Sequence, residues 1–304
     1  MSLYTWSLDR ETLGLGWLPF HSTMVHWRFS DAVYVVLVIL LDGLIFERIE
    51  PYQRQFTVND LTISHPFAPV ERVSAEMLLW IVTVVPPLVI IFCVLLLTPK
   101  QHKFYVLYVS ILGHFVALGT CVFVTDVFKN WIGRCRPDFL DRCQPDPKAV
   151  KDTLYYAKEI CTTKHRKKLL DGFRTTPSGH SSMSFSALGY TSLWLLGQLQ
   201  ATRSEVGAWR SVVAMLPTLY AFYVAMSRTQ DYRHHFVDVL LGSVLGFLLA
   251  WWSYRRVFPA VTSPKSHLPH ALADSEHSYA RLGDETYPLT SHPDDANSEI
   301  RSAV

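Results

Sequence analysis

The stretch SRTQDYRHHFVD, residues 227–238, joins two apolar segments of the chain, at about 210–227 and 236–254. Two further clusters of charged and small residues lie at the ends of apolar segments, KNWIGRCRP at 129–137 and PSGH at 177–180. Together the clusters supply what phosphate chemistry requires: cations that hold a dianion, a turn with free backbone N–H groups, and two separated histidines. The sequence therefore predicts a phosphate site at the ends of apolar segments.

Apolar stretches of roughly membrane-spanning length recur along the chain. They lie at about 30–47, 77–98, 104–127, 181–200, 210–227 and 236–254. Because backbone polar groups in hydrocarbon must be satisfied within their own segment, we expect each stretch to be a helix. The predicted fold is an all-α, multi-pass membrane helical bundle with six transmembrane helices. The shorter, Ser- and Gly-containing fourth stretch also fits a buried core helix.

The composition of the chain indicates which kinds of molecule it is expected to bind. A chain of 304 residues with a formal net charge of only +2 does not point to nucleic acid. Hydrophobic residues make up 49% and charged residues 18%, a bias typical of lipid-embedded chains. No CxxC or His-rich pattern indicates a metal site. We therefore expect the lipid bilayer and membrane lipids as partners, with no nucleic acid, no metal and no cofactor, and the oligomeric state stays open.

The chain is expected to form one membrane domain with two flanking segments. Residues 1–29 are predicted to be an N-terminal cytosolic segment, and residues 30–255 the six-span domain, with a core at about 75–255. Residues 256–304 are rich in Ser, His, Pro, Asp and Glu. Such a composition cannot bury enough apolar area to fold alone, so we expect a disordered cytosolic tail.

Basic residues beside the spans predict the orientation of the chain in the membrane. Several lie on the side of both termini: Lys100, Lys103, Arg203, Arg210, Arg255 and Arg256. By the positive-inside rule both termini are cytosolic, and the third and fifth loops are lumenal or extracellular in an organelle that the sequence does not identify. Because two spans separate these loops, both emerge on one membrane face, where the clusters can meet.

The first two clusters each have a local geometry suited to an anion. Lys129 and Arg136 are seven residues apart, which on a helix returns to nearly the same face, and Pro137 is expected to bend the chain after them. The segment Ser178–His180 precedes an apolar stretch, so its N–H groups and hydroxyl are expected at a helix N-terminus. Taken singly, these residues also fit membrane anchors and an ordinary turn.

The third cluster suggests an oriented imidazole. His234 and Asp238 are four residues apart, so at the start of a helix they would face one another. A carboxylate so placed can accept a proton bond from one ring nitrogen and leave the other free to attack. A His–Asp pair at this spacing is also a common helix pair. We assign no chemistry to His235, which would point elsewhere on the helix.

Other patterns bear on packing. Pro86-Pro87 interrupts the second apolar stretch and predicts a kink. Gly242 and Gly246 form a GxxxG pattern, which more often means close packing than dimerisation. Cys143 and Cys161 lie in the long third loop, where they either pair in an oxidising compartment or remain free thiols.

The clusters in their order, KX6RP, PSGH and SRX5HX3D, resemble the type 2 phosphatidic acid phosphatase superfamily over about residues 75–255. That superfamily shares a histidine-phosphatase core with vanadium haloperoxidases. The resemblance implies that His234 attacks phosphorus, that Asp238 orients it, and that His180 protonates the leaving oxygen. It also implies a set of phosphate-binding residues: Lys129, Arg136, Ser178, Gly179 and Arg228.

Finer similarities favour the lipid phosphate phosphatase and diacylglycerol pyrophosphate phosphatase branch. They cover NDLTISHPFAPVERV at 59–73, RPDFLDRC at 136–143 and DGFRTTPSGHSS at 171–182. Thr175-Thr176 departs from the Ser-Phe usual in that branch, which would alter the rim of the pocket.

The implied activity is Mg²⁺-independent hydrolysis of phosphatidate, diacylglycerol pyrophosphate and related lipids through a phosphohistidine intermediate. Three fixed cations would take the place of a metal at the phosphoryl oxygens. The alternatives are a phosphatase for a soluble phosphate ester and a non-catalytic lipid-binding or signalling member. A transporter is a further class, but no inverted repeat is evident.

Overall fold

A computed structural model describes residues 20–46 and 48–273 of the chain. By its internal contacts the chain divides into two units, Met1–Pro269 and His270–Val304. The regular elements of the described residues are helices, together with the isolated bridges Phe56↔Tyr155 and Pro145↔Cys161. The expected all-α class is therefore confirmed. Most of the predicted N-terminal segment and residues 274–304 of the predicted tail lie outside the described residues.

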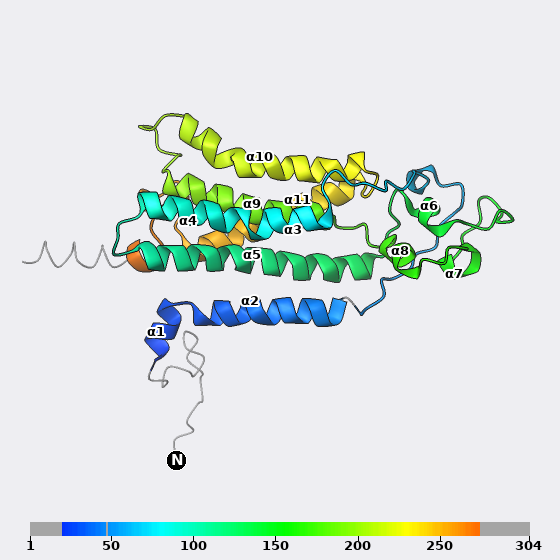
Figure 1. The fold of residues 1–304 in the computed structure, drawn as a ribbon, viewed down its shortest axis with the longest axis horizontal. Helices are drawn as coiled ribbons and strands as arrows, with labels where there is room; N and C mark the ends of the chain where they lie inside the picture. Colours follow the sequence, from blue (N-terminus) through cyan, green and yellow to red (C-terminus); the bar gives the residue numbers. More distant parts are fainter. Residues whose placement is uncertain (1–19, 47, 274–304) are drawn as a thin grey trace, which may run out of the picture. The chain divides into compact units, whose positions relative to one another are not determined.

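Long helices make up most of the first unit (Figure 1). They are α2 (Phe29–Leu41, continued by a π-helical turn Asp42–Phe46), α3 (Ala75–Thr83), α4 (Val85–Leu97), α5 (Lys103–Ile132), α9 (Gly179–Gln198), α10 (Trp209–Gln230) and α11 (Phe236–Val257). Short helices are α1 (His21–His26), α6 (Phe139–Cys143), α7 (Ala157–Ile160), α8 (Arg166–Asp171) and the 3₁₀ turn Leu61–Ile63.

Each expected apolar stretch falls on a helix or on two consecutive helices. Among the described residues, three segments are long and apolar enough to cross a membrane: Ala75–Leu97, Lys103–Ile132 and Phe236–Val257. The chain therefore carries helices fit for a bilayer, and the number of six spans remains a prediction.

The second apolar stretch is broken where the prolines occur. Helix α3 ends at Thr83 and α4 begins at Val85, with prolines in its first turn. Proline has no N–H to donate and its ring crowds the preceding turn, so a helix interrupts just before it. The expected interruption is therefore present, at Val84 just before Pro86-Pro87.

Helix α9 lies among the other long helices and contacts α10, α11, α5 and α3 (Figure 1). Small residues cover much of its surface, including Ser182, Ser186 and Gly189, and almost the whole helix is buried. Small side chains let neighbouring backbones approach closely, which explains how a segment of modest hydrophobicity occupies the interior.

The glycines of α11 face α9 within the same chain. A Cβ atom on Gly242 would lie 2.5 Å from the carbonyl oxygen of Ser178, and one on Gly246 would meet the carbonyl oxygen of Ser182. The interpretation of the GxxxG pattern as close packing is therefore confirmed. This contact also ties the start of α9, where PSGH lies, to α11.

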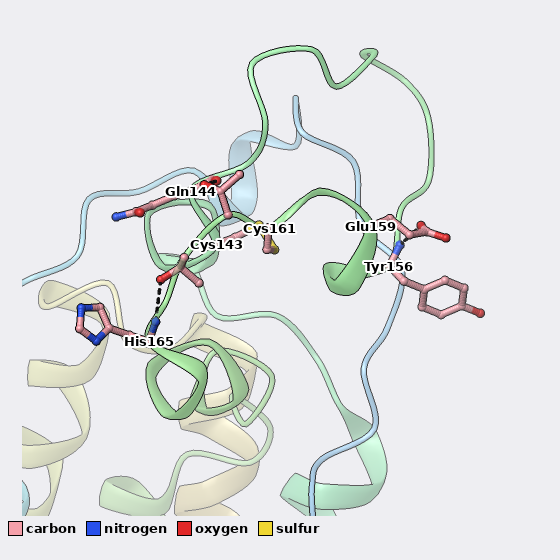
Figure 2. The surroundings of a disulfide bond; sticks show 8 residues. Cys143, Gln144, Tyr156, Glu159, Cys161 and His165 are labelled. Atoms are coloured by element: carbon pink, nitrogen blue, oxygen red, sulfur yellow. Dashed lines mark hydrogen bonds between the residues drawn. A yellow bond between two sulfur atoms is a disulfide. The ribbon is translucent and has the colours of Figure 1, made fainter.

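Beyond the ends of the long helices, α6, α7 and α8 form a cap with the loop before α3 (Figure 1). A disulfide joins Cys143 to Cys161, so the structure selects pairing over free thiols (Figure 2). Next to it, the Gln144 carbonyl accepts hydrogen bonds from the backbone and the hydroxyl of Thr162. Phe139 and Phe173 pack edge-on in the apolar interior of the cap.

The segment after α11 differs from the expected disordered tail. Phe258 is fully buried and Leu268 nearly so. The hydroxyl of Ser266 donates to the carbonyl of Gly197, and Gln198 donates to the carbonyl of His267. Because these contacts hold residues up to 268 against α9, the boundary placed at 256 is too early.

Candidate active site

The N-terminus of α9 presents free backbone donors. Ser178 is the N-cap, and its hydroxyl accepts a hydrogen bond from the backbone N–H of Ser181. In the described part of the chain, the N–H groups of Gly179 and His180 meet no acceptor. They lie at the positive end of a helix of 20 residues, which favours an anion. Lys129 Nζ lies directly over Gly179, only 2.6 Å from where a Cβ atom would be.

Lys129 and Arg136 are not on one continuous helix, contrary to expectation. Helix α5 ends at Ile132, because Gly133 adopts the left-handed conformation (φ 60°) that closes a helix. Arg136 is held instead by Asp171 of α8, with Nη2 2.8 Å from Oδ1 and Nε 2.9 Å from the carbonyl oxygen. Both cations nevertheless act electrostatically on the two predicted histidines.

His234 lies in the turn between α10 and α11, before the helix that was expected to contain it. Tyr232 takes a left-handed conformation (φ 53°), and the N–H groups of Arg233 and His234 both donate to the Arg228 carbonyl. His234 Nδ1 lies 2.7 Å from the Thr175 carbonyl oxygen. Since a carbonyl only accepts, Nδ1 carries the proton and Nε2 keeps its lone pair.

Asp238 does not bond to His234 directly, contrary to the expected helical pair. Its carboxylate accepts hydrogen bonds from the hydroxyls of Thr175 (2.8 Å) and Thr176 (2.5 Å). The Thr175 hydroxyl also lies 3.2 Å from His234 Nδ1. Thr175 therefore links His234 and Asp238 through its hydrogen bonds. Both threonines are buried beside the predicted catalytic residues, so the departure Thr175-Thr176 lies within the site and not at its rim.

His235 and Arg134 also hold Asp238. His235 is the N-cap of α11, and its backbone N–H and Nδ1 lie 2.9 and 3.1 Å from Asp238 Oδ2. Arg134 Nη1 lies 3.1 Å from Oδ1. The carboxylate is fully buried, so these donors satisfy an otherwise costly charge. The His235 contact has the N-cap to N3 spacing of a capping box, whereas the Arg134 contact has no helical spacing.

His180 points toward the loop before α3. Its Nε2 lies 3.1 Å from the Val73 carbonyl, so this nitrogen carries a proton, and Arg228 Nη1 lies 3.4 Å away. Burial, followed by the charges of Arg228 and Lys129, lowers the pKa of His180 to about 3. The imidazole is neutral in this state of the site.

His234 is also neutral near pH 7. Burial lowers the pKa of His234 well below its usual range, and the charges of Arg136 and Lys129 lower it further, against the opposing charge of Asp238. A neutral imidazole with a free Nε2 lone pair is the form that acts as a nucleophile.

Arg228 is buried between two carboxylates. Its Nη1 lies 2.8 Å from Glu71 Oε2 and its Nη2 2.7 Å from Asp231 Oδ2. Asp231 follows Arg228 by three residues and so had a recognisable spacing. Glu71 is distant in the sequence; it lies in the stretch 59–73 that resembles the lipid phosphatase branch, but no spacing linked it to Arg228.

The predicted residues therefore gather in one place, at the cap end of α5, α9, α10 and α11. The set comprises Lys129, Arg136, Ser178, Gly179, His180, Arg228, His234 and Asp238. Sequence reasoning missed further contacts, made by Glu71, Val73, Arg134, Thr175, Thr176, Asp231 and His235, the last of which had been given no role. Cations, helix N–H groups and two neutral imidazoles in one buried site can bind and attack a phosphoryl group.

Comparison with known proteins gives a concordant result. The family model described as "PAP2 superfamily" matches residues 110–261. The chain is 51% identical over 243 residues to diacylglycerol pyrophosphate phosphatase 1 of Saccharomyces cerevisiae, covering 80% of this chain and 84% of that protein.

More distant relatives include a probable diacylglycerol pyrophosphate phosphatase 1 of Schizosaccharomyces pombe, 34% identical over 84% of this chain and 91% of that protein. Lipid phosphate phosphatase 2 of Arabidopsis thaliana is 30% identical over 83% of this chain and 86% of that protein. No solved structure shows a significant match.

Proposed function

Because the chain belongs to the PAP2 superfamily, we propose that it is a membrane phosphatase that hydrolyses lipid phosphates without Mg²⁺, with phosphatidate and diacylglycerol pyrophosphate as substrates. The observation that carries the proposal is the grouping of His234, its Nε2 lone pair free, with His180 and three cations, Lys129, Arg136 and Arg228, which we propose bind phosphate. The names of the similar proteins support the substrate class.

The proposed reaction has two displacements at phosphorus. His234 Nε2 attacks the phosphoryl group, the bond from phosphorus to the leaving oxygen breaks, and His180 gives that oxygen a proton. Water then gives a proton to His180 and attacks the phosphohistidine, the bond from phosphorus to Nε2 breaks, and inorganic phosphate leaves with both imidazoles restored. Lys129, Arg136 and Arg228 neutralise the equatorial oxygens, which is the main requirement of phosphoryl transfer.

The depressed pKa of His180 is compatible with this role once substrate binds. The cations that lower the pKa face a phosphate dianion in the complex, and an anion near an imidazole favours its protonated form. Substrate binding would therefore recruit the proton that the leaving group needs.

The proposed arrangement in the membrane follows the sequence prediction. Six helical spans would place both termini in the cytosol and the site at the lumenal or extracellular surface. A lipid could then keep its tails in the bilayer while its headgroup enters the basic site. Residues 30–255 would form the membrane domain.

A phosphate-release assay of the purified protein tests the function. We expect dioleoyl phosphatidate and diacylglycerol pyrophosphate to be hydrolysed at full rate in excess chelator, and glucose 6-phosphate much more slowly. Preference for the sugar phosphate would favour a soluble ester as substrate, and the absence of hydrolysis would favour a non-catalytic member.

Replacement of the proposed nucleophile tests the mechanism. His234→Ala should reduce kcat by roughly 10⁴-fold or more, as loss of a nucleophile does, and His180→Ala by at least roughly 10²-fold. Radiolabelled substrate should leave an acid-labile, alkali-stable label on the wild-type protein and none on His234→Ala. Wild-type turnover by folded His234→Ala protein would remove the proposed nucleophile.

A further inference from the structure

One carboxylate bridges two buried arginines at the edge of the proposed site. Glu71 Oε2 lies 2.8 Å from Arg228 Nη1, and Oε1 lies 2.8 Å from Arg233 Nη2. Both arginines are buried, with side chains 1% and 7% exposed, so neither charge is stabilised by bulk water. A buried charge is stabilised by its ion-pair partners, and here Arg228 and Arg233 share the partner Glu71.

The pairs continue from Arg233 to the other end of the site. Arg233 Nη1 lies 3.3 Å from Asp138, which pairs with Arg142 at 2.8 Å. Arg142 Nη1 lies 2.8 Å from one oxygen of Asp171, whose other oxygen lies 2.8 Å from Arg136 Nη2. Positive and negative groups thus alternate along a continuous chain. It leads from one proposed phosphate-binding arginine, Arg228, through Glu71 to the other, Arg136.

The two residues after Glu71 contact other parts of the same site. Arg72 donates its backbone N–H to Asp231 (2.9 Å), and its guanidinium pairs with the same carboxylate. Asp231 in turn pairs with Arg228. The Val73 carbonyl accepts from His180 Nε2. Three consecutive residues of one loop therefore hold three groups of the site.

We propose that Glu71–Val73 is a positioning segment for the site, in which Glu71 orients the Arg228 guanidinium for phosphate. The inference rests on the proposed function. Arg228 donates Nε–H to Ser227 and one N–H of each remaining nitrogen to Glu71 and Asp231. A guanidinium has five N–H donors in a rigid plane, so one remains on each terminal nitrogen for an anion, the one on Nη1 beside His180 Nε2, 3.4 Å away. Held in this way, these two donors need no reorganisation when phosphate arrives.

The variant Glu71→Gln tests the proposal because it keeps the shape of the side chain and removes its charge. Its amide would turn an N–H donor toward one of the arginines. We expect the Ki of inorganic phosphate and the KM of the lipid substrate to rise roughly tenfold or more, as when a partner that orients a metal ligand is lost. Glu71→Asp, which restores the charge, should recover part of the loss.

Glu76→Gln is the matched control. Glu76 lies five residues later, is exposed, and forms no ion pair among the described residues. This variant should bind phosphate like the wild type. Thermal unfolding in detergent and gel filtration show whether each variant is folded. If Glu71→Gln does not fold, the phosphate affinity of Glu71→Asp is compared with that of the wild type instead.

A double-mutant cycle separates positioning from a general structural role. If Glu71 acts through Arg228, Glu71→Gln should cause little further loss of phosphate affinity in an Arg228→Ala background. An equal loss in both backgrounds, or a folded Glu71→Gln protein with wild-type Ki and KM, would overturn the inference.

Direct titration with inorganic phosphate distinguishes failure of this inference from failure of the proposed function. If the wild type binds phosphate but releases none from lipids, the proposed function fails, while weaker binding by Glu71→Gln still supports positioning. Equal binding by both proteins contradicts positioning alone. Absence of phosphate binding by the wild type contradicts both.

Discussion

Thr175 joins the imidazole of His234 to the carboxylate of Asp238. Its carbonyl fixes the proton on His234 Nδ1, and its hydroxyl bonds to Asp238 Oδ2 at 2.8 Å. Thr175 thus orients the His234 ring with its carbonyl and connects the ring to the Asp238 carboxylate with its hydroxyl, two roles that one direct His–Asp hydrogen bond would combine. Because the backbone carbonyl is independent of the side chain, the two roles can be separated by mutation.

We therefore predict that Thr175→Val reduces kcat/KM by roughly tenfold to a hundredfold, the cost of losing a hydrogen bond to a charged group. Thr175→Ser should stay near wild type because it keeps the hydroxyl. Thr229→Val is the control, since among residues 20–46 and 48–273 that hydroxyl bonds only to the Met226 carbonyl. Lipid phosphate hydrolysis measures the effect, and equal activity of Thr175→Val and Thr175→Ser would contradict it.

The neutral state of His180 predicts a pH-dependent stability. The pKa of His180 is about 3 in the folded protein, against an ordinary value of 6.5 in the unfolded chain. Below pH 6.5 the unfolded chain therefore binds more protons than the folded protein. The stabilisation is complete above pH 6.5 and is lost as the pH falls toward 3. At pH 5 the loss is about 2 kcal/mol.

Chemical unfolding of wild type and His180→Gln between pH 7 and about pH 5 measures this contribution. The stability of the wild type should fall more steeply than that of the variant, because glutamine does not titrate. Parallel pH profiles for the two proteins would show that His180 is not held neutral.

At the scale of elements, the contact between α9 and α11 positions the site. Ser178 N–H donates to the Asp238 carbonyl at 3.0 Å, so the N-cap of one helix is bonded to the first turn of the other. The glycines of α11 allow this approach. Helix packing therefore brings the PSGH turn, the proposed anion site, next to the third cluster.

Gly246→Ala should destabilise the protein by about 1–3 kcal/mol, because the added methyl would overpack against Ser182 and Ser186. Gly43→Ala is the control, since a Cβ there would meet no atom within 4 Å. Thermal unfolding in detergent gives the comparison. If Gly246→Ala instead changes the oligomeric state and leaves unfolding unaltered, the pattern serves an interface between chains.

At the scale of the whole molecule, the proposed topology places the cap and the loop between α9 and α10 on opposite membrane faces. Lys151 in the cap and Ser204 in that loop are both exposed. Single cysteines at these positions, with Cys93, Cys121 and Cys135 replaced, report their side of the membrane.

In sealed vesicles with the cytosolic face outward, an impermeant maleimide should label Ser204→Cys but not Lys151→Cys. Detergent should expose both positions, which controls for the reactivity of each cysteine. Labelling of both from one side before detergent is added would exclude the six-span arrangement.

The sequence alone indicated the helical class, the apolar stretches and the predicted site residues. Hydrophobic length and the positions of proline are local properties, and the break at Pro86-Pro87 shows how directly they act on a helix. Chain order and the predicted parity of the loops also led us to expect that the three clusters meet, and the described residues bring them together, although the number of spans stays a prediction.

Only the tertiary structure decided how those residues are held. Glu71, Val73 and Thr175 lie far from His234 and Arg228 along the chain, and their roles come from through-space hydrogen bonds and ion pairs that have no sequence period. The end of α5 at Gly133 and the turn at Tyr232 likewise moved Arg136 and His234 off the helices that spacing suggested. Periodicity predicts which residues share a face of one helix. The partner of a buried charge is instead set by how several helices and loops pack together.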